Sequence, residues 1–313
     1  MVLDLVAIDT ETTGVGWYDE AFMISMATDA YSIVYDRRIM NIGEWDDAIA
    51  EVSKALANAN KIIMHNAKFD MQKLIRLGIN GFVFYDKFED TQAMAHLIDE
   101  HQSTSLKHLA RHYLGETTDE DEVLKVYRRK AKLKKEDGYE PIPHDILAPY
   151  ARKDAEFTLR LYSHLENRLP DDVRPLYELE KQMTLALLRV EAQAMSVDRE
   201  YVINKRREYG DKIYQTKARI AELSGSDFNP QSPTQVLAAL EGRGIRVAKT
   251  DKATLASVDD ELASLIVELR EANKIKATYF DAMYEESKYG ILHPNFRQHG
   301  TRTGRMSSGS AEA

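Results

Sequence analysis

The segment of residues 2–12 restricts the fold more than any other part of the chain, because an apolar run there ends in two carboxylates. Residues 5–8 are all apolar, and Asp9 and Glu11 follow directly, with Thr10 between them. In a β-strand, residues i and i+2 point to the same side, so the two acidic side chains share one face. Two like charges in a small volume are unfavourable unless a cation, a shared proton or solvent compensates them. We therefore predict a buried strand with a polar site at its C-terminal end.

Strand-like and helix-like segments alternate through residues 1–165. Short apolar runs predict strands, whereas apolar residues spaced three and four apart predict helices. Pro149 is expected in the first turn of the last helix, where its missing N–H does no harm. Such alternation is typical of an α/β domain with a mixed sheet. The predicted strands cover residues 2–8, 22–28, 31–38 and 61–65, and the predicted helices cover residues 44–58, 68–78, 92–100, 105–115 and 147–169.

The second half of the chain has a different character, which predicts a mainly helical domain. Long charged helices are expected at residues 176–194 and 199–223. A joint that contains Pro and Ser, SGSDFNPQSPTQ, follows them, and a further long helix is expected at about residues 259–286. We place the boundary between the two domains near residue 168.

Charge and composition narrow the class of protein. The chain contains no Cys, and no stretch reaches the roughly 18 to 20 apolar residues of a membrane-spanning helix. Met1 leads directly into the first strand without a signal peptide, so we predict a cytoplasmic location. The net charge of −9 does not exclude a nucleic acid, because residues 125–135 contain seven Lys or Arg residues and no acid. This basic run is equally well explained as a solvated helix or loop, or as a guide for a single strand.

Three polar stretches in the first domain are not explained by periodicity. The first is Asp9 with Glu11, the second is HNAKFD with Asp70 at the start of a helix, and the third is YARKD. In the third stretch Tyr150 and Asp154 are four residues apart and share one helix face. Together the four carboxylates would form an all-oxygen site that suits Mg²⁺ or Mn²⁺.

Each stretch alone has a simpler explanation. A single acidic pair after a strand is most often a solvated turn, and Asp70 alone fits a charge at a helix N-terminus. Tyr150 and Asp154 alone fit a pair on a helix surface. Asp90 is expected to be a helix N-cap rather than a ligand. Three histidines have no partner pattern that would indicate a ligand, and we expect them to be structural or exposed: His65, His96 and His144.

The order and spacing of these stretches resemble the three motifs of the DEDD exonuclease superfamily, whose sheet is similar to that of ribonuclease H. Asp9 and Glu11 match the first motif. Asn66 and Asp70 match the second, and Tyr150 and Asp154 match the third. A Tyr four residues before the last Asp is typical of the tyrosine branch of this superfamily. The other branch has a His five residues before that Asp, whereas position 149 of this chain is Pro.

The resemblance implies phosphodiester hydrolysis with two divalent metal ions. It assigns Asp9, Glu11, Asp70 and Asp154 to the metals, and Asp9 would contact both ions. Tyr150 would orient the attacking water. The residues assigned by the resemblance to the terminal nucleotide are Thr10, Glu11 and Asn66.

The second half resembles the family A DNA polymerases. The segment FNPQSPTQVLAALEGRGI is similar to their thumb motif, and LREANKIKATYFDAM is similar to a helix that faces the primer–template backbone. The segment HPNFRQHGTRTGRMSS closely matches the family's signature before the first palm carboxylate. Arg supplies bidentate contacts to phosphate and Lys supplies a point charge. The residues assigned to DNA by this resemblance are Lys276, Thr278, Arg302, Thr303, Arg305 and Ser307.

The resemblance divides the chain into three parts. Residues 1–168 would form a ribonuclease H-like 3′–5′ exonuclease domain, residues 169–290 a helical thumb, and residues 291–313 the start of a palm. The remaining palm and the fingers have no counterpart here, so we expect no DNA synthesis by this chain alone. Three explanations fit the missing palm and fingers: an engineered fragment, a polymerase split between two genes, or a shortened or frameshifted reading frame. A chain that begins at the exonuclease resembles the phage enzymes, which would place it in the cytoplasm of a bacterial host.

The sequence therefore predicts a metal-dependent 3′–5′ exonuclease that acts on DNA and would proofread in a whole polymerase. An RNA 3′-exonuclease of the tyrosine branch is the alternative enzyme, against which the thumb motifs argue. A protein of another class is a non-catalytic DNA-binding subunit that docks a separate palm and fingers fragment. The complete set of carboxylates argues against an inert site but not against docking.

Overall fold

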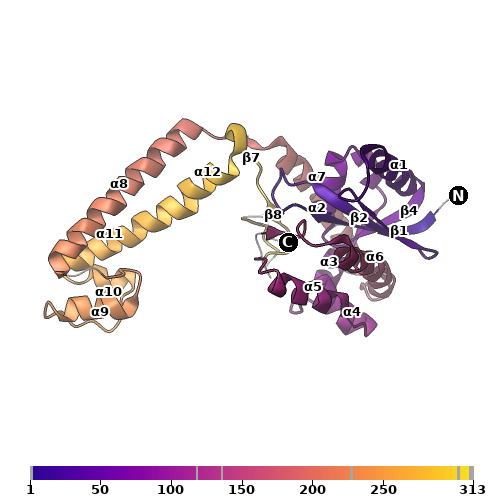
Figure 1. Ribbon diagram of the computed structural model, residues 1–313. Coiled ribbons are helices and arrows are strands. Elements are labelled where there is room, and N and C mark those ends of the chain that lie inside the picture. Colours follow the sequence, from indigo (N-terminus) through magenta and orange to yellow (C-terminus); the bar gives the residue numbers. More distant parts are fainter. Residues whose placement is uncertain (1–2, 118, 135–136, 226–227, 302–303, 310–313) are drawn as a thin grey trace. The chain divides into compact units, whose positions relative to one another are not determined.

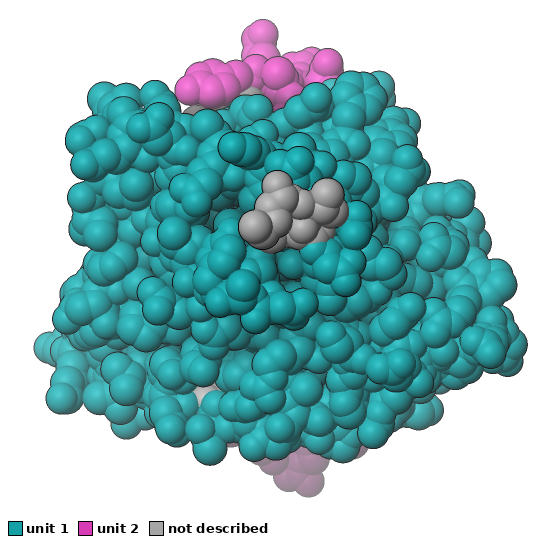
Figure 2. Space-filling view, turned by 90° about the vertical axis from the view of Figure 1, so that its right-hand side faces the viewer, with its two compact units in different colours: residues 1–193, 294–313 teal, residues 194–293 magenta. Residues whose placement is uncertain are grey.

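The structure, a computed structural model, describes residues 3–117, 119–134, 137–225, 228–301 and 304–309. The chain forms two compact units, which Figure 2 shows in teal and magenta. The first unit consists of residues 1–193 and 294–313, and the second consists of residues 194–293. The boundaries predicted from the resemblance, at residues 168 and 290, concern functional domains and stay predictions.

The first unit is built on a mixed five-stranded sheet, as predicted. The strands lie in the order β3-β2-β1-β4-β5. The strand β2 is antiparallel to β1 and β3, whereas β4 is parallel to β1 and β5. The short β5 was not among the predicted strands. The strands are β1 (Leu3–Thr12), β2 (Ala21–Ala27), β3 (Ser32–Asp36), β4 (Ala59–Met64) and β5 (Phe88–Asp90).

Helices cover both faces of this sheet (Figure 1). The first helix begins at a capping box, in which Asn41 accepts a hydrogen bond from the backbone of Glu44 and Glu44 accepts one from the backbone of Asn41. The helical segments are α1 (Ile42–Asn58), α2 (Ala67–Arg76), η1 (Gly81–Phe84), α3 (Thr91–Ile98), α4 (Leu106–Leu114), α5 (Asp119–Lys130), α6 (His144–Glu166) and α7 (Arg174–Gln193).

The side chains of β1 alternate between these two helical layers. Val6 and Ile8 belong to a buried cluster with α1 and α2, whereas Ala7 belongs to a cluster with α3, α4 and α6. The same alternation places Asp9 and Glu11 on the face that α6 covers. The central strand therefore delivers its carboxylates toward α6, and its even-numbered residues toward α2.

The helix α6 corrects one expectation. It begins at His144, so Pro149 lies inside the helix, beyond its first turn. The ring of Pro149 cannot donate a hydrogen bond to the carbonyl of Asp145 one turn earlier. The sequence pattern did not reveal the start at His144, because the residues before Pro149 carry no cap signal of the usual kind: Pro143 occupies the N-cap position and makes no side-chain cap bond.

The last part of the described chain packs on α7 within the first unit. The strands β8 (Phe296–Arg297) and β9 (Ser307–Ser308) form a small antiparallel pair. The backbone N–H of Phe296 donates to Glu191 at 2.7 Å, and the side-chain amide of Gln298 donates to the carboxylate of Glu180 at 2.7 Å. The C-terminal segment is therefore attached to α7 by polar contacts.

The second unit is mainly helical, as predicted. Its long helices α8 (Arg199–Ser224) and α11 (Glu261–Ile275) pack side by side (Figure 1). The short helices α9 (Pro233–Glu241) and α10 (Lys252–Ala256) join them in one buried apolar cluster. None of the described helices of the chain is long and apolar enough to cross a lipid bilayer.

A π-helical turn, η3 (Lys276–Asp281), continues α11 into α12 (Ala282–Glu286). The long helix predicted near residues 259–286 is thus confirmed, with one irregular turn. The unit also contains the 3₁₀ turn η4 (Lys288–Gly290) and the antiparallel strand pair β6 (Met195–Ser196) and β7 (Ile291–Leu292).

Candidate active site

The end of β1 and the middle of α6 bring three carboxylates together. Asp9 and Glu11 pair with Ser25 and Met23 of the antiparallel strand β2, so both remain in regular strand geometry. A register shift follows between Glu11 and Thr12, and Thr12 then pairs with Ala21. Asp154 reaches the same place from α6. One carboxylate oxygen of each acidic residue lies within 4.8 Å of those of the other two.

This three-carboxylate cluster, Asp9, Glu11 and Asp154, fits a hard divalent cation. All of its donors are carboxylate oxygens, and both Glu11 and Asp154 are only 6% exposed. Oxygen ligands of this kind suit Mg²⁺ or Mn²⁺ and offer no nitrogen or sulfur preference for zinc or copper. Within the part of the chain that the structure describes, no other three His or acidic side chains approach one another this closely.

The electrostatics of the cluster also fit a cation. Burial raises the pKa of Glu11 to about 8, and the negative charge of Asp154 adds to this effect. Burial also raises the pKa of Asp9 well above its usual value, and the charge of Asp70 is the next largest cause. Without a cation such a cluster retains protons near neutral pH, because burial and the mutual repulsion of the carboxylates disfavour their fully charged form. A divalent cation would replace these protons.

Asp70 lies beside the three-carboxylate cluster rather than in it. Its oxygen Oδ1 accepts hydrogen bonds from the backbone N–H of Thr10 at 3.0 Å and from the Thr10 hydroxyl at 2.7 Å. Burial raises the pKa of Asp70 to about 7, although both hydrogen bonds from Thr10 act in the opposite direction. The alternation of side chains along β1 explains why Asp70 contacts Thr10, since Thr10 faces α2 while Asp9 and Glu11 face α6. The metal-binding role of Asp70 and the substrate-binding role of Thr10 stay predictions.

The junction between β4 and α2 has a strained residue and a shared cap. Asn66 adopts a left-handed conformation, with φ of 67°, at the N-cap of α2. Its side chain makes no cap bond; instead the backbone N–H groups of Asn66 and Ala67 donate to the carboxylate of Asp90, at 3.1 and 2.9 Å. The Asn66 side chain is thus not used as a cap, and its predicted nucleotide contact stays a prediction.

Asp90 is an N-cap, as predicted, and it serves two helices. It accepts hydrogen bonds from the backbone of Gln92 at 2.9 Å and Ala93 at 3.4 Å at the start of α3, in addition to those from the start of α2. His65 is held in the same region, where its Nδ1 lies 2.8 Å from the hydroxyl of Thr91. His65 therefore has a structural contact, as the sequence suggested.

Tyr150 sits one helical turn before Asp154 and is buried, with 9% exposure. Burial raises the pKa of Tyr150 well above its usual value, and the charge of Asp154 contributes. Its ring lies 5.9 Å, centre to centre, from the ring of Tyr139. The side chain of Tyr150 also lowers the pKa of Asp154, against the larger effect of burial. The i, i+4 spacing thus brings the two groups together as expected.

Lys107 is the residue of this site that sequence reasoning missed. It lies in α4, and its Nζ donates a hydrogen bond to Oδ1 of Asp154. The same Nζ lies 4.0 Å from the centre of the Tyr150 ring. In the sequence Lys107 is one of several basic residues of an amphipathic helix, a pattern that indicates a solvated face. Only the packing of α4 against α6 turns it inward.

The basic run at residues 125–135 is partly explained by local contacts. Residues up to Lys130 belong to α5, and Arg128 donates a hydrogen bond to the backbone carbonyl of Gly138 at 2.6 Å. The guanidinium of Arg128 lies 5.5 Å from the centre of the Tyr139 ring. One of these cations therefore supports the loop beside Tyr150, and a role of the run in guiding a single strand stays a prediction.

The residues predicted to contact DNA occupy varied environments. Lys276 forms an ion pair with Asp281 at 2.8 Å, and Thr278 is exposed in the same π-helical turn. Arg305 is exposed, and Ser307 pairs with Arg297 in the β8–β9 ladder. Arg302 and Thr303 lie outside the described residues. All six remain predictions as DNA contacts.

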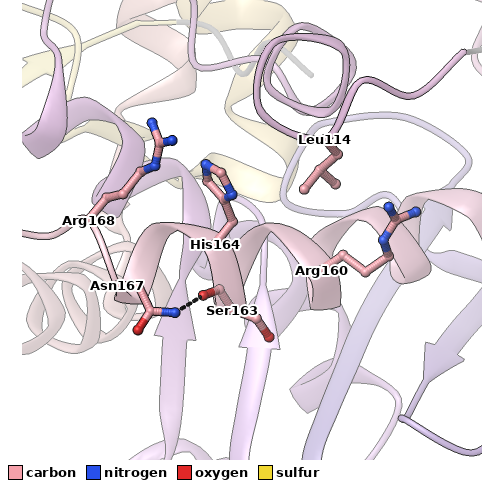
Figure 3. Close-up of a pocket in the computed structure, with 6 residues that line it drawn as sticks. All are labelled: Leu114, Arg160, Ser163, His164, Asn167 and Arg168. Atoms are coloured by element: carbon pink, nitrogen blue, oxygen red, sulfur yellow. Dashed lines mark hydrogen bonds between the residues drawn. The ribbon is translucent and has the colours of Figure 1, made fainter.

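A pocket of about 610 Å³ lies at the end of α6 (Figure 3). It contains none of the predicted site residues. Two of its cations are already engaged, since Arg160 pairs with Glu116 at 2.5 Å and the Arg168 guanidinium lies 5.3 Å from the centre of the Tyr113 ring. The lining residues are Leu114, Arg160, Ser163, His164, Asn167 and Arg168.

Comparison with known families matches both halves of the chain. The sequence profile of the 3′–5′ exonuclease family matches residues 2–170, and that of DNA polymerase family A matches residues 199–312. DNA polymerase I of Pseudomonas aeruginosa is 28% identical to this chain, and the alignment covers 97% of this chain and 36% of that protein. DNA polymerase DpoZ of Salmonella phage PMBT28 is also 28% identical, with coverage of 97% and 52%.

A solved structure has the same fold. The POL domain of Pol1 from M. smegmatis, in complex with DNA primer-template and dNTP, superimposes with a TM-score of 0.70 at 21% identity. The superposition covers 97% of this chain and 50% of that chain. The chain thus spans about half or less of the length of these three proteins.

Proposed function

The chain belongs to the family A DNA polymerases and contains their 3′–5′ exonuclease domain, and from this membership we propose that it removes 3′-terminal nucleotides from DNA by metal-dependent hydrolysis. One observation carries the proposal. The oxygens of Asp9, Glu11 and Asp154 gather within 4.8 Å at the end of the central strand, with Tyr150 one turn before Asp154. An acidic group of this kind with a neighbouring phenol suits phosphodiester hydrolysis better than acyl or hydride transfer.

Each protein group then has a role. A pair of divalent ions, when bound, supplies positive charge on the phosphate oxygens and lowers the pKa of the attacking water. Asp9, Glu11 and Asp154 provide the oxygens that hold the cations. Asp70 uses Oδ1 for Thr10, so we assign its Oδ2 to the metal site. Tyr150 orients the water through its hydroxyl, and we assign the Asn66 side chain to the terminal nucleotide.

We further propose DNA as the substrate and partner. The profile match over residues 199–312 and the fold shared with a polymerase solved on primer–template support this choice over RNA. Lys276, Thr278, Arg305 and Ser307 would contact the DNA backbone. Lys276 would have to exchange its ion pair with Asp281 for a phosphate. A mispaired 3′ end would reach the exonuclease more readily, because less free energy is needed to unpair it.

A gel assay with 5′-labelled DNA tests the proposal. The substrates are a primer–template with a 3′ mismatch, its matched form and an RNA primer, each with Mg²⁺, Mn²⁺ or chelator. We expect metal-dependent shortening of DNA from the 3′ end, faster for the mismatch. The variant Asp9→Ala should lose hydrolysis by about a hundredfold or more, because Asp9 is central to the cation site. Circular dichroism controls for its fold.

The outcomes separate the candidate functions. Near-normal turnover by Asp9→Ala at matched metal concentration would refute the assigned site. Preferential shortening of the RNA primer would favour an RNA exonuclease. DNA binding without any hydrolysis would favour the docking subunit, which a lane with nucleotides and a separate palm and fingers fragment then tests directly.

A further inference from the structure

Lys107 is the cation in closest contact with the carboxylates of the site. Its Nζ donates a hydrogen bond to Oδ1 of Asp154, and only 17% of its side chain is exposed. The side chain crosses from α4 to α6, so the contact joins two helices that pack against each other. A buried ion pair of this kind contributes little net stability by itself, but the loss of one partner leaves a buried charge uncompensated.

The same ammonium group also contacts two aromatic rings of α6. It lies 4.0 Å from the centre of the Tyr150 ring and 5.6 Å from that of Phe157. A cation over an aromatic face is attracted by the ring electrons, and the attraction grows when solvent is excluded. Lys107 therefore fixes the carboxylate of Asp154 and the ring of Tyr150 relative to each other. These are the two groups that the proposed function assigns to metal binding and to the water.

The charge of Lys107 reaches the whole cluster. Its Nζ is hydrogen-bonded to Asp154, whose carboxylate oxygen lies within 4.8 Å of carboxylate oxygens of Asp9 and Glu11. A single positive charge near three carboxylates favours their ionised form. The same charge repels a divalent cation that approaches their oxygens.

We propose that Lys107 is a positioning residue with two effects. It fixes the side chains of Asp154 and Tyr150 relative to each other. It also acts as the internal counter-ion of the cluster and competes with the metal for Asp154. The ammonium group lies next to Asp154, so its positive charge opposes the binding of a divalent cation to the same carboxylate. Lys107 therefore weakens metal binding and at the same time orders the side chains of Asp154 and Tyr150. The positioning effect rests on the proposed function, whereas the counter-ion effect concerns metal binding alone.

The chain offers a matched control in Lys153. It lies on α6 beside Asp154, with 38% of its side chain exposed, and pairs with Glu156 at 3.2 Å. Its Nζ lies 5.9 Å from the centre of the same Phe157 ring that Lys107 contacts. Lys153→Met therefore removes one positive charge and one ring contact from the same neighbourhood, without removing the bond to Asp154.

The test compares Lys107→Met, Lys107→Arg and Lys153→Met in the full chain. Electron paramagnetic resonance measures Mn²⁺ binding without DNA, and single-turnover hydrolysis is measured at saturating Mn²⁺. We expect Lys107→Met to bind Mn²⁺ about tenfold more tightly, because one repelling charge is gone. We expect the same variant to hydrolyse DNA about tenfold more slowly, because Asp154 and Tyr150 lose their shared contact. Lys107→Arg should keep the affinity near that of the wild type, and Lys153→Met should change neither quantity.

Each result decides one part of the inference. Unchanged or weaker Mn²⁺ binding by Lys107→Met overturns the counter-ion effect, since a merely structural role cannot raise affinity. Tighter binding with unchanged hydrolysis overturns the positioning effect. If the wild type binds Mn²⁺ but does not hydrolyse DNA, the proposed function fails while the counter-ion effect is still tested by affinity. If Lys107→Met does not fold, Lys107→Gln replaces it with the same expectations.

Discussion

Replacing Glu11 by Gln measures the free-energy cost of holding a charge inside the three-carboxylate cluster. Glu11 is only 6% exposed, and this burial raises its pKa from 4.5 to about 8. The unfolded chain therefore releases this proton near pH 4.5, whereas the folded chain retains it until about pH 8. The favourable contribution is complete below pH 4.5 and is lost as the pH rises toward 8.

The size of the effect follows from the same values. The interval from 4.5 to 8 corresponds to an upper limit of about 5 kcal/mol, at about 1.4 kcal/mol for each pH unit. The neighbouring carboxyl groups share protons with Glu11, so we expect about 2–5 kcal/mol. Without metal, the free energy of unfolding of the wild type should fall by this amount between pH 4.5 and 8 relative to that of Glu11→Gln, which cannot ionise.

Urea unfolding in the presence of chelator gives the measurement. The two tryptophans, Trp17 and Trp45, both belong to the first unit, so their fluorescence reports the unit that contains the site. Glu178→Gln serves as the control, because this carboxyl group is 61% exposed on α7. Added Mg²⁺ should stabilise the wild type at pH 8 more than Glu11→Gln. Parallel pH profiles of the wild type and Glu11→Gln would refute the argument from burial.

Three further changes test other parts of the structure. Tyr150→Phe should slow single-turnover hydrolysis less than Asp154→Ala, because it keeps the ring and loses only the hydroxyl; equal or reversed effects would contradict the assigned roles. Asp90→Ala should lower the free energy of unfolding by about 2 kcal/mol or more, since it removes caps from both α2 and α3; a urea titration with a loss below 0.5 kcal/mol would argue against the double cap. Arg305→Ala should weaken duplex binding and reduce the salt dependence, the slope of log affinity against log salt, by about 0.9; an unchanged slope in fluorescence anisotropy would remove Arg305 from the DNA contacts.

Local periodicity allowed much of the site to be predicted. The i, i+2 spacing of Asp9 and Glu11 fixes a common strand face, and the i, i+4 spacing of Tyr150 and Asp154 fixes a common helix face. The sequence also predicted the mixed sheet, the helical second half and the N-cap role of Asp90. Its error at Pro149 arose because a proline is typical of a first helical turn, whereas α6 begins five residues earlier, at His144.

The positions of Asp70 and Lys107 required the tertiary structure. Asp70 lies outside the three-carboxylate cluster and its Oδ1 accepts two hydrogen bonds from Thr10, yet its charge still raises the pKa of Asp9, and its metal-binding role stays a prediction. Lys107 belongs to an amphipathic helix, where a lysine is normally solvated, and it turns inward only where α4 meets α6.

The sequence by itself determined the direction of each side chain along its own strand or helix, and the set of carboxylates available for a cation site. Only the tertiary structure decided which elements meet, and therefore that three carboxylates gather at one point with an ammonium group beside them. The physical reason is that backbone periodicity is local, whereas the burial and the neighbouring charges that set the chemistry of Glu11 and Asp154 come from residues distant in the sequence.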